Sequence, residues 1–267
     1  MSTALLEVDH VTKDFVRGGL LSQQRIRAVD DVSFRLQAEQ PEIFTIIGES
    51  GSGKSTLASM ILNLTQASAG QLQFGGANLA DIRSTADRHR FMAQIQPIFQ
   101  NPFEAFNPLK QIDHYLYMSA LRFTQARDIS AATDCADAAL NKVGLSLAEV
   151  RGRFPHELSG GQLQRIAVAR ALIPSPKLIV ADEPVSMVDA SLRMSIVNLF
   201  KTLRDDHGIS IIYITHDLAT AYYISDHIIV MQHGKVVESG DARAVLTNPK
   251  HPYSQQLKSA VLLPDTP

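Results

Sequence analysis

The fold of this 267-residue chain is decided by the stretch Gly48-Glu-Ser-Gly-Ser-Gly-Lys-Ser-Thr56. The stretch fits the pattern G-x-x-x-x-G-K-[ST], and it follows the apolar run Ile43–Ile47 and precedes the helix-like run Leu57–Leu64. A buried strand, a glycine-rich turn and a helix in this order are typical of α/β proteins that hold phosphate groups at the carboxyl end of the strand. The sequence therefore predicts an α/β fold with a phosphate site in this turn.

The residue types of this loop suit a nucleoside triphosphate. Glycines let the backbone curl until successive N–H groups face one concavity, where the start of a helix adds partial positive charge. Lys54 can reach the β- and γ-phosphates, and the Ser55 hydroxyl can ligate magnesium. The predicted ATP-binding residues of the loop are Gly48, Ser50, Gly51, Gly53, Lys54, Ser55 and Thr56. The alternative is a glycine-rich turn that binds no ligand.

A second motif, Leu178-Ile-Val-Ala-Asp-Glu183, is an apolar strand that ends on two carboxylates. Asp182 is the predicted second hard-oxygen ligand of magnesium. Glu183 should point into the crevice beyond the carboxyl end of the strand, and it is the predicted general base for the attacking water. Two carboxylates that merely cap a strand end are the alternative.

The pattern of apolar residues changes along the chain. The first hundred residues are mostly strand-like, with runs at Leu5–Val8 and Ile26–Leu36, whereas residues 102–157 show helical spacing. From Lys177 onwards, short apolar runs alternate with helix-like segments, which is typical of a parallel sheet covered by helices. We predict a single domain over 1–267, a helical insertion at about 101–158, and a tail at about 248–267 that begins as a short helix.

Charge and composition exclude several classes of protein. A formal net charge of -2 gives no basic field for a nucleic-acid backbone, so we predict no nucleic-acid partner. The single cysteine, Cys135, cannot form an intramolecular disulfide, which fits a reducing cytosol, and no signal-peptide pattern is seen at the N-terminus. Apolar runs are far shorter than the ~20 residues of a membrane-spanning helix. A role at a membrane would need another chain as the anchor.

Between the two motifs lies Leu158-Ser-Gly-Gly-Gln162, followed by the helix-like run Leu163–Ile173. With this signature the sequence resembles the nucleotide-binding subunits of ABC transporters over nearly its whole length. The resemblance implies a P-loop ABC ATPase core with an N-terminal antiparallel β subdomain and an inserted α-helical subdomain. Ser159 and the amides of Gly160 and Gly161 would form a second anion-binding helix start. An ordinary helix N-cap is the alternative.

In this family two subunits pack head to tail, and each signature closes on the γ-phosphate held by the other subunit. The predicted signature residues, acting in trans, are Leu158, Ser159, Gly160, Gly161 and Gln162. Asp189, in Ser186-Met-Val-Asp189, matches the loop where the subunits meet, although Met187 and Val188 are bulkier than is usual there. The resemblance therefore implies that the active site needs a second chain.

Three further positions match residues that contact the nucleotide in the family. Phe15 corresponds to the aromatic residue that stacks on adenine, although an aromatic in the core of a strand fits the sequence too. Gln100 corresponds to a glutamine that touches magnesium and water, and His216 to a histidine that holds the γ-phosphate and water. A loop glutamine and a structural histidine are the alternatives. Glu183, His216 and Gln100 are the predicted catalytic residues, and Ser55, Gln100 and Asp182 the predicted magnesium ligands.

Two segments narrow the family to the ATPases of oligopeptide and dipeptide importers. The segments Phe99–Pro108 and Asn248–Tyr253 are similar to stretches of those subunits, but Phe106 replaces a leucine. Many members continue into a cysteine-containing tail that is missing here, so no iron–sulfur cluster is expected. The implied function is ATP hydrolysis that energises import of peptides, or of a related solute such as an oligosaccharide or nickel.

The implied location is the cytoplasmic face of the inner membrane. The implied partners are a second ATP-binding subunit, identical or homologous, the membrane permease subunits, and a substrate-binding protein that acts through the permease. Aromatic residues near the start of the helical insertion suggest a surface that binds the permease, or else a self-contained core: Phe103, Phe106, Tyr115 and Tyr117.

Two other functions stay open, a soluble ABC ATPase outside transport and a partner subunit that binds ATP with little hydrolysis.

Overall fold

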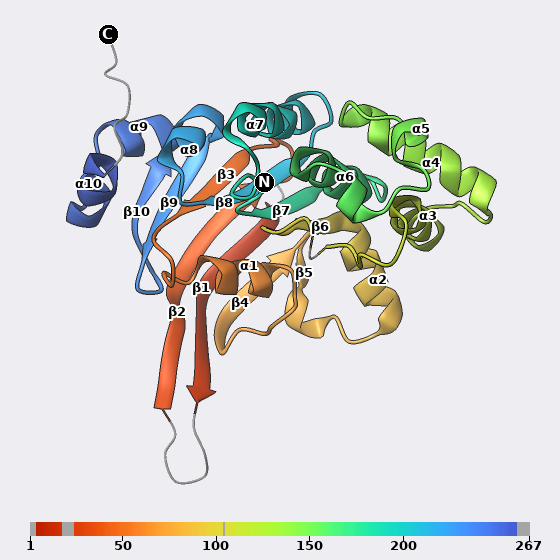
Figure 1. The fold of residues 1–267 in the computed structure, drawn as a ribbon. Coiled ribbons are helices and arrows are strands. Elements are labelled where there is room, and N and C mark those ends of the chain that lie inside the picture. Colours follow the sequence, from red (N-terminus) through yellow and green to blue (C-terminus); the bar gives the residue numbers. More distant parts are fainter. Residues whose placement is uncertain (1–3, 18–23, 104, 261–267) are drawn as a thin grey trace. The chain divides into compact units, whose positions relative to one another are not determined.

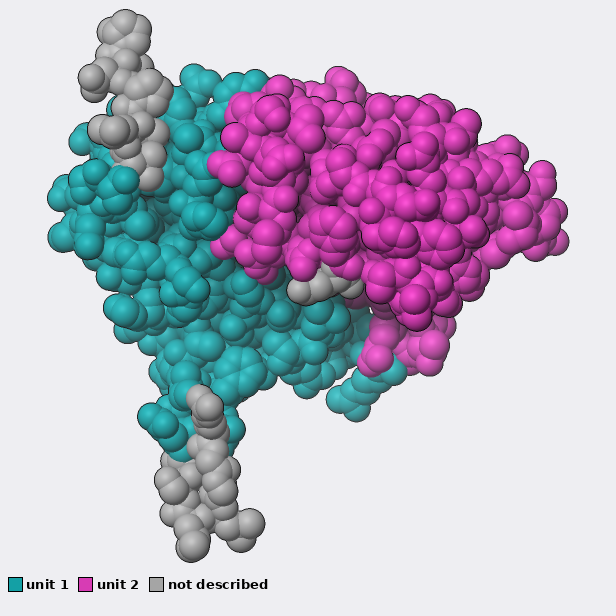
Figure 2. All heavy atoms as spheres, viewed as in Figure 1, with its two compact units in different colours: residues 1–83, 210–267 teal, residues 84–209 magenta. Residues whose placement is uncertain are grey.

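The structure is a computed structural model that describes residues 4–17, 24–103 and 105–260 (Figure 1). The chain divides into two compact units, residues 1–83 with 210–267 and residues 84–209 (Figure 2). We call them the first unit and the second unit. The predicted helical insertion falls inside the second unit, and residues 261–267 of the predicted tail lie outside the described residues.

An antiparallel sheet forms the amino-terminal part of the first unit (Figure 1). Its strands, in spatial order, are β2 (Gln24–Gln37), β1 (Ala4–Arg17), β4 (Ala69–Phe74) and β5 (Ala77–Asn78). Strand β1 runs well past the predicted Leu5–Val8, because polar residues continue the pairing. Asp14 accepts hydrogen bonds from Arg25 at 2.6 Å and Arg27 at 3.0 Å across the β1–β2 pair, and these two guanidinium groups, Arg27 first, lower the pKa of Asp14.

Parallel strands form the other layer of the first unit. Strand β3 (Ile43–Ile47) lies between β8 (Ser210–Thr215) and β9 (His227–Gln232) and is parallel to both, and β10 (Lys235–Asp241) is antiparallel to β9. Every residue of β3 and β8 is buried, which explains their continuous apolar runs in the sequence. Ile47 pairs with Thr215, so Gly48 and His216 follow neighbouring strand ends.

Helices complete the first unit. They are α1 (Lys54–Ile61), α8 (Leu218–Ile224), α9 (Ala242–Thr247) and α10 (Pro252–Ser259), with a 3₁₀ turn at Leu79–Asp81. Residues of α8, α9 and α10 share one apolar cluster with the end of β3 and with β9: Ile47, Leu218, Ala221, Ile228, Val230, Ala242, Val245, Leu246 and Tyr253. Helix α1 begins three residues earlier than the predicted Leu57, so Ser55 and Thr56 belong to its first turn.

The second unit contains two parallel strands and a set of helices. The strands are β6 (Ile95–Ile98) and β7 (Leu178–Asp182). The helices are α2 (Thr85–Gln94), α3 (Ile112–Phe123), α4 (Ile129–Lys142), α5 (Leu147–Val150), α6 (Gly160–Leu172) and α7 (Ala190–Asp205), with a 3₁₀ turn at Pro155–Glu157. Helix α4 packs against both α3 and α6. Helix α2 was not predicted, whereas α3, α4 and α5 lie in the stretch 102–157 for which helical spacing was predicted. Among the described residues, no helix combines the length and the apolar character that crossing a membrane requires.

Candidate nucleotide site

The phosphate loop of the first unit leaves a helix start open to an anion. Helix α1 has Gly53 at its N-cap, with φ 104°, and no side chain caps it. The first backbone N–H groups of a helix have no intrahelical acceptor, and their dipoles favour negative charge. Lys54 is 6% exposed, and its Nζ donates hydrogen bonds to the carbonyl oxygens of Gly48 and Glu49, each at 2.7 Å. The ammonium group therefore lies within the curl of the loop.

Two glycines of the loop are required by close backbone neighbours. A Cβ atom at Gly48 would lie 2.2 Å from the carbonyl oxygen of Met231, and one at Gly53 would lie 2.3 Å from that of Ala28. Gly51 also has a positive φ, 82°, but a Cβ there would meet nothing within 4 Å. The loop thus packs against the backbone of β9 at Gly48 and of β2 at Gly53, and it is open at Gly51.

This difference predicts unequal effects of two alanine substitutions. Gly51→Ala should cost about 1–2 kcal/mol of local strain, the penalty for a left-handed non-glycine residue, and leave ATP affinity within a few fold. Gly53→Ala adds a clash with backbone that cannot yield without moving the start of α1, so ATP affinity should fall at least about tenfold, or ~1.4 kcal/mol. Titration calorimetry with ATP measures both, and equal affinities for the two variants would contradict the expectation.

The first unit also holds two of the three predicted nucleotide contacts outside the loop, His216 and Phe15. His216 follows β8 directly and is exposed, and the turn after it is held by Asp217, whose N–H donates to the Thr215 hydroxyl at 3.0 Å. Phe15 is 43% exposed, so it is not an aromatic of the strand core. The Lys13 ammonium lies 5.1 Å from the centre of the Phe15 ring. One face of this ring therefore carries a cation, and the other suits a planar base.

In the second unit, the predicted base and the predicted glutamine are in contact. Gln100 Nε2 donates a hydrogen bond to Glu183 Oε2 at 3.1 Å. Glu183 has φ 45°, a left-handed conformation that is unusual for a residue other than glycine. Its carbonyl oxygen accepts hydrogen bonds from the N–H and the hydroxyl of Ser186, at 3.1 and 2.9 Å, which hold the turn. Strain of this kind collects at functional sites, where the surrounding structure fixes it.

The signature forms a helix start in the second unit. Ser159 is the N-cap of α6, its hydroxyl accepts from the N–H of Gln162 at 3.2 Å, and Gln162 Oε1 accepts from the N–H and hydroxyl of Ser159 at 3.0 and 3.2 Å. This reciprocal capping box fixes the Gln162 side chain on the helix end. Leu158 is buried and anchors the segment. The geometry is that of an N-cap, the alternative left open above, and it also exposes the Ser159 side chain at a positive helix end.

The start of α7 packs against the signature. A Cβ at Gly161 would lie 2.8 Å from Leu192 Cδ1, and one at Gly160 would lie 3.6 Å from the carbonyl oxygen of Met187. Asp189 is the exposed N-cap residue of α7. Of the two bulky residues before it, Met187 is 59% exposed and Val188 is 4% exposed. The extra bulk of Val188 is therefore inside the unit, and only Met187 adds to its surface.

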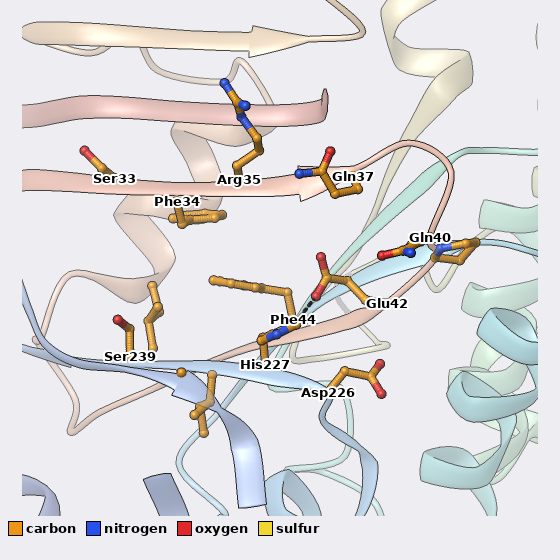
Figure 3. Close-up of a pocket in the computed structure, with 14 residues that line it drawn as sticks. Ser33, Phe34, Arg35, Gln37, Gln40, Glu42, Phe44, Asp226, His227 and Ser239 are labelled. Carbon is orange, nitrogen blue, oxygen red and sulfur yellow. Dashed lines mark hydrogen bonds and ion pairs between the residues drawn. The ribbon is translucent and has the colours of Figure 1, made fainter. Parts of the chain in front are cut away.

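A hollow of about 570 Å³ lies in the first unit (Figure 3). The stacked rings of Phe34 and Phe44 line it, with centroids 4.6 Å apart, as does His227, whose Nδ1 lies 2.6 Å from a Glu42 carboxylate oxygen. These residues lie at the amino end of β3, whereas the loop follows its carboxyl end, about 16 Å away at ~3.3 Å a residue. Open α/β sheets bind ligands at the carboxyl ends of strands, so this hollow is no part of the nucleotide site.

The fold and the loop together define a P-loop nucleotide-binding protein of the α/β class. The sequence profile of the family described as "ABC transporter" matches residues 29–186. The chain belongs to this family, and it is an ABC ATPase.

Related sequences cover nearly the whole chain. The oligopeptide transport ATP-binding protein OppF of Haemophilus influenzae is 40% identical, with 98% of this chain and 79% of the relative covered. OppF of Bacillus subtilis is 38% identical, with 99% and 85% covered. A solved dimeric structure of the ATP-binding cassette MJ0796 bound to ADP and Pi is similar with a TM-score of 0.77 and 26% identity, covering 89% of this chain and 99% of that one. These similarities confirm the predicted ABC ATPase fold.

Sequence reasoning missed one contact to the phosphate loop. The hydroxyl of Tyr253, in α10, accepts a hydrogen bond from the N–H of Glu49 at 2.9 Å. The available signal was the segment Asn248–Tyr253, which the sequence marked as a family resemblance without assigning it a role.

Proposed function

We propose that this chain energises an importer of oligopeptides or dipeptides, or of a related solute, by hydrolysing ATP. The observation that carries the proposal is similarity along almost the full length to proteins named for this task. Besides the OppF relatives, the dipeptide transport ATP-binding protein DppF of Haemophilus influenzae is 38% identical over 97% of this chain. Peptides are therefore the first solutes to test.

ATP binding is assigned to the loop and to β1. The backbone N–H groups at the start of α1 and the Lys54 ammonium would hold the phosphates, with Gly48, Ser50, Gly51, Gly53, Ser55 and Thr56 completing the loop. Phe15 would stack on adenine, which its exposure supports. Lys13, already beside the Phe15 ring, would keep its charge on the opposite ring face.

The proposed magnesium ligands are the side-chain oxygens of Ser55, Asp182 and Gln100. The Ser55 hydroxyl belongs to the first turn of α1, and Asp182 ends β7. Gln100 uses its amide nitrogen to contact Glu183, which leaves its amide oxygen as the atom for a cation. Hydroxyl, carboxylate and amide oxygens are ligands that magnesium accepts, so these residues fit it, and bound magnesium would neutralise phosphate charge.

Catalysis is assigned to three side chains. Glu183 would accept the proton of the attacking water, and its contact with Gln100 would fix the carboxylate in one orientation. His216 would hold the γ-phosphate and the water from the end of β8. The left-handed backbone of Glu183, fixed by Ser186, supports a functional role for this residue.

A second ATP-binding subunit would complete the site. Ser159, Gly160 and Gly161 would offer their helix start to the nucleotide of the partner, and Asp189 would lie in the contact between subunits. The dimeric cassette bound to ADP and Pi is the relative that supports this assembly. One gene encodes the pair of ATP-binding subunits if the second subunit is identical to this chain, and two genes encode it if the second subunit is a homologue.

A permease-binding surface is assigned to exposed apolar side chains of the second unit. Phe99, Phe103, Leu109 and Met118 are 44, 47, 84 and 51% exposed. Of the four aromatic residues named from the sequence, Phe103 is exposed and Tyr115 and Tyr117 are half-buried. Phe106 is 2% exposed, because its ring packs edge-on against Tyr115 and under the Arg170 guanidinium, so it fits the alternative of a self-contained core. The four exposed residues suit a helix of a membrane subunit, which would hold the chain at the cytoplasmic face of the membrane and link it to a substrate-binding protein.

The test replaces part of this surface. We expect Phe103→Ser combined with Leu109→Ser to reduce co-purification with co-expressed permease subunits by about tenfold, the effect of losing ~1.4 kcal/mol of contact, while ATP hydrolysis by the free chain stays unchanged. Ile129→Ser is the matched control, because Ile129 is 54% exposed elsewhere in the second unit. Recovery of the unaltered chain in the soluble fraction whether or not permease is present would favour a soluble ABC ATPase instead.

A further inference from the structure

The first turn of α10 brings a tyrosine from the carboxyl-terminal part of the chain to the phosphate loop. Tyr253 is the second residue of α10, and its hydroxyl accepts the hydrogen bond of the Glu49 N–H at 2.9 Å. Glu49 is the second residue of the loop and lies 204 positions earlier in the sequence. None of the roles assigned above uses this contact.

Tyr253 is held rigidly enough to act as a fixed acceptor. Tyr253 is 5% exposed and belongs to the apolar cluster that includes Ile47, the last residue of β3. His251 caps α10 by accepting the N–H of Tyr253 at 3.2 Å. The carboxylate of Glu238 on β10 accepts the N–H groups of Lys250 at 2.8 Å and His251 at 3.1 Å. Burial raises the pKa of Tyr253, so its hydroxyl is neutral at physiological pH.

The contact acts on the same peptide group as the loop lysine. The carbonyl of Gly48 and the N–H of Glu49 belong to one peptide plane, and no cis peptide occurs among the described residues. In a trans peptide these two groups point in opposite directions. Lys54 Nζ donates to the carbonyl at 2.7 Å, and Tyr253 accepts from the N–H. One peptide is therefore held from both sides, by Lys54 and by Tyr253.

We propose that Tyr253 is a positioning residue of the ATPase, which fixes the Gly48–Glu49 peptide and thereby the resting place of the Lys54 ammonium. The inference rests on the proposed role of Lys54 as a phosphate ligand. Without the tyrosine hydroxyl, this peptide can rotate, because Gly48 tolerates many conformations. The carbonyl acceptor of the ammonium then turns with it, and the loop must be ordered again when ATP binds.

The experiment removes only the hydroxyl. Tyr253→Phe keeps the ring in the apolar cluster, so the chain should fold with nearly unchanged stability. We expect the KM for ATP to rise about 3- to 10-fold, the range for a net hydrogen bond, with kcat changed less than about twofold. Tyr222→Phe is the matched control, because Tyr222 packs against the same cluster. Its KM should equal that of the unaltered chain.

Hydrogen exchange of the Glu49 amide reports whether the contact itself is lost, and the KM for ATP reports whether that loss affects the ATPase. Protection of this amide in the nucleotide-free protein should fall in Tyr253→Phe and persist in Tyr222→Phe, while amides of β3 keep their protection in both. An unchanged KM for ATP in Tyr253→Phe, whether or not Glu49 loses protection, would overturn the inference and leave the contact with a purely structural role. Wild-type ATP affinity in Lys54→Ala would instead overturn the proposed role of Lys54, so the two failures are distinguishable.

Discussion

Replacement of Glu183 by glutamine is expected to lower ATP turnover by about 10²–10⁴-fold, the usual loss when a general base is removed. Glutamine matches glutamate in size, and its amide oxygen can still accept the hydrogen bond that Gln100 donates. The left-handed backbone, fixed by the Ser186 contacts, should be unchanged. The variant should therefore still bind ATP but accept no proton, and its dimer should stay closed around the nucleotide.

Two measurements check this expectation. Phosphate release at saturating ATP gives the turnover, and sedimentation with and without ATP gives the fraction of dimer. Glu39→Gln is the control, because Glu39 is an exposed carboxylate in the loop after β2. Near-normal hydrolysis in Glu183→Gln would remove Glu183 from its role. Turnover that is already negligible in the unaltered dimer would favour the partner subunit that binds ATP with little hydrolysis.

Replacement of Lys54 by alanine is expected to abolish nucleotide binding at millimolar ATP. The ammonium would otherwise make charge-assisted hydrogen bonds to two phosphates, each worth about 1.5–3 kcal/mol, so affinity should fall about 10²–10⁴-fold. The substitution also removes the donor that joins the carbonyls of Gly48 and Glu49, which loosens the loop. Binding is lost for both reasons, and hydrolysis is lost with it.

Titration calorimetry with a non-hydrolysable ATP analogue measures the affinity of this variant. Lys177→Ala is the matched control, because Lys177 is an exposed lysine and should bind the analogue normally. Circular dichroism and the melting temperature establish that both variants are folded. An affinity within about threefold of the unaltered chain would show that the loop holds phosphate without its lysine.

The part of the candidate site that could be predicted from the sequence consists of residues that are adjacent in the chain. The phosphate loop, the strand before it and the helix after it are contiguous, so their pattern is readable in one short window. The run Ile43–Ile47 agrees with β3 at both ends because a strand buried on both faces is continuously apolar. Asp182 and Glu183 are marked in the same way by the apolar strand that precedes them.

Elements with little apolar periodicity, and contacts between residues far apart in the sequence, were harder to predict. Helix α2 buries a single residue, Phe91, so it has almost no apolar periodicity, and its one local signal is the cap made by Ser84. The sequence could not decide between a surface and a core position for Phe106, because its partner Arg170 lies far along the chain. The hydroxyl of Tyr253 meets Glu49 across most of the sequence. No local pattern carries such information.

The boundaries of the helical insertion stay a prediction. The two compact units separate at Ser84 and Ser210, well outside the predicted 101–158. Helices α3, α4 and α5 do lie in the predicted range, but α4 also packs on α6, which contains most of the signature. Compactness and helical composition are different criteria, which is why they divide this chain at different residues.

In the proposed two-subunit assembly, the capping box at the start of α6 would bear on the rate of the ATPase cycle. The Ser159 hydroxyl accepts from the Gln162 N–H and points its own hydrogen at Gln162 Oε1. To engage a phosphate oxygen, this hydrogen needs only to turn about the Cβ–Oγ bond, while the bond that caps the helix stays in place. Side-chain rotations of this size take picoseconds to nanoseconds, whereas collective motions of domains take microseconds to milliseconds. The signature would therefore be ready whenever a partner arrives, and the slower approach of the two subunits would set the pace of each cycle.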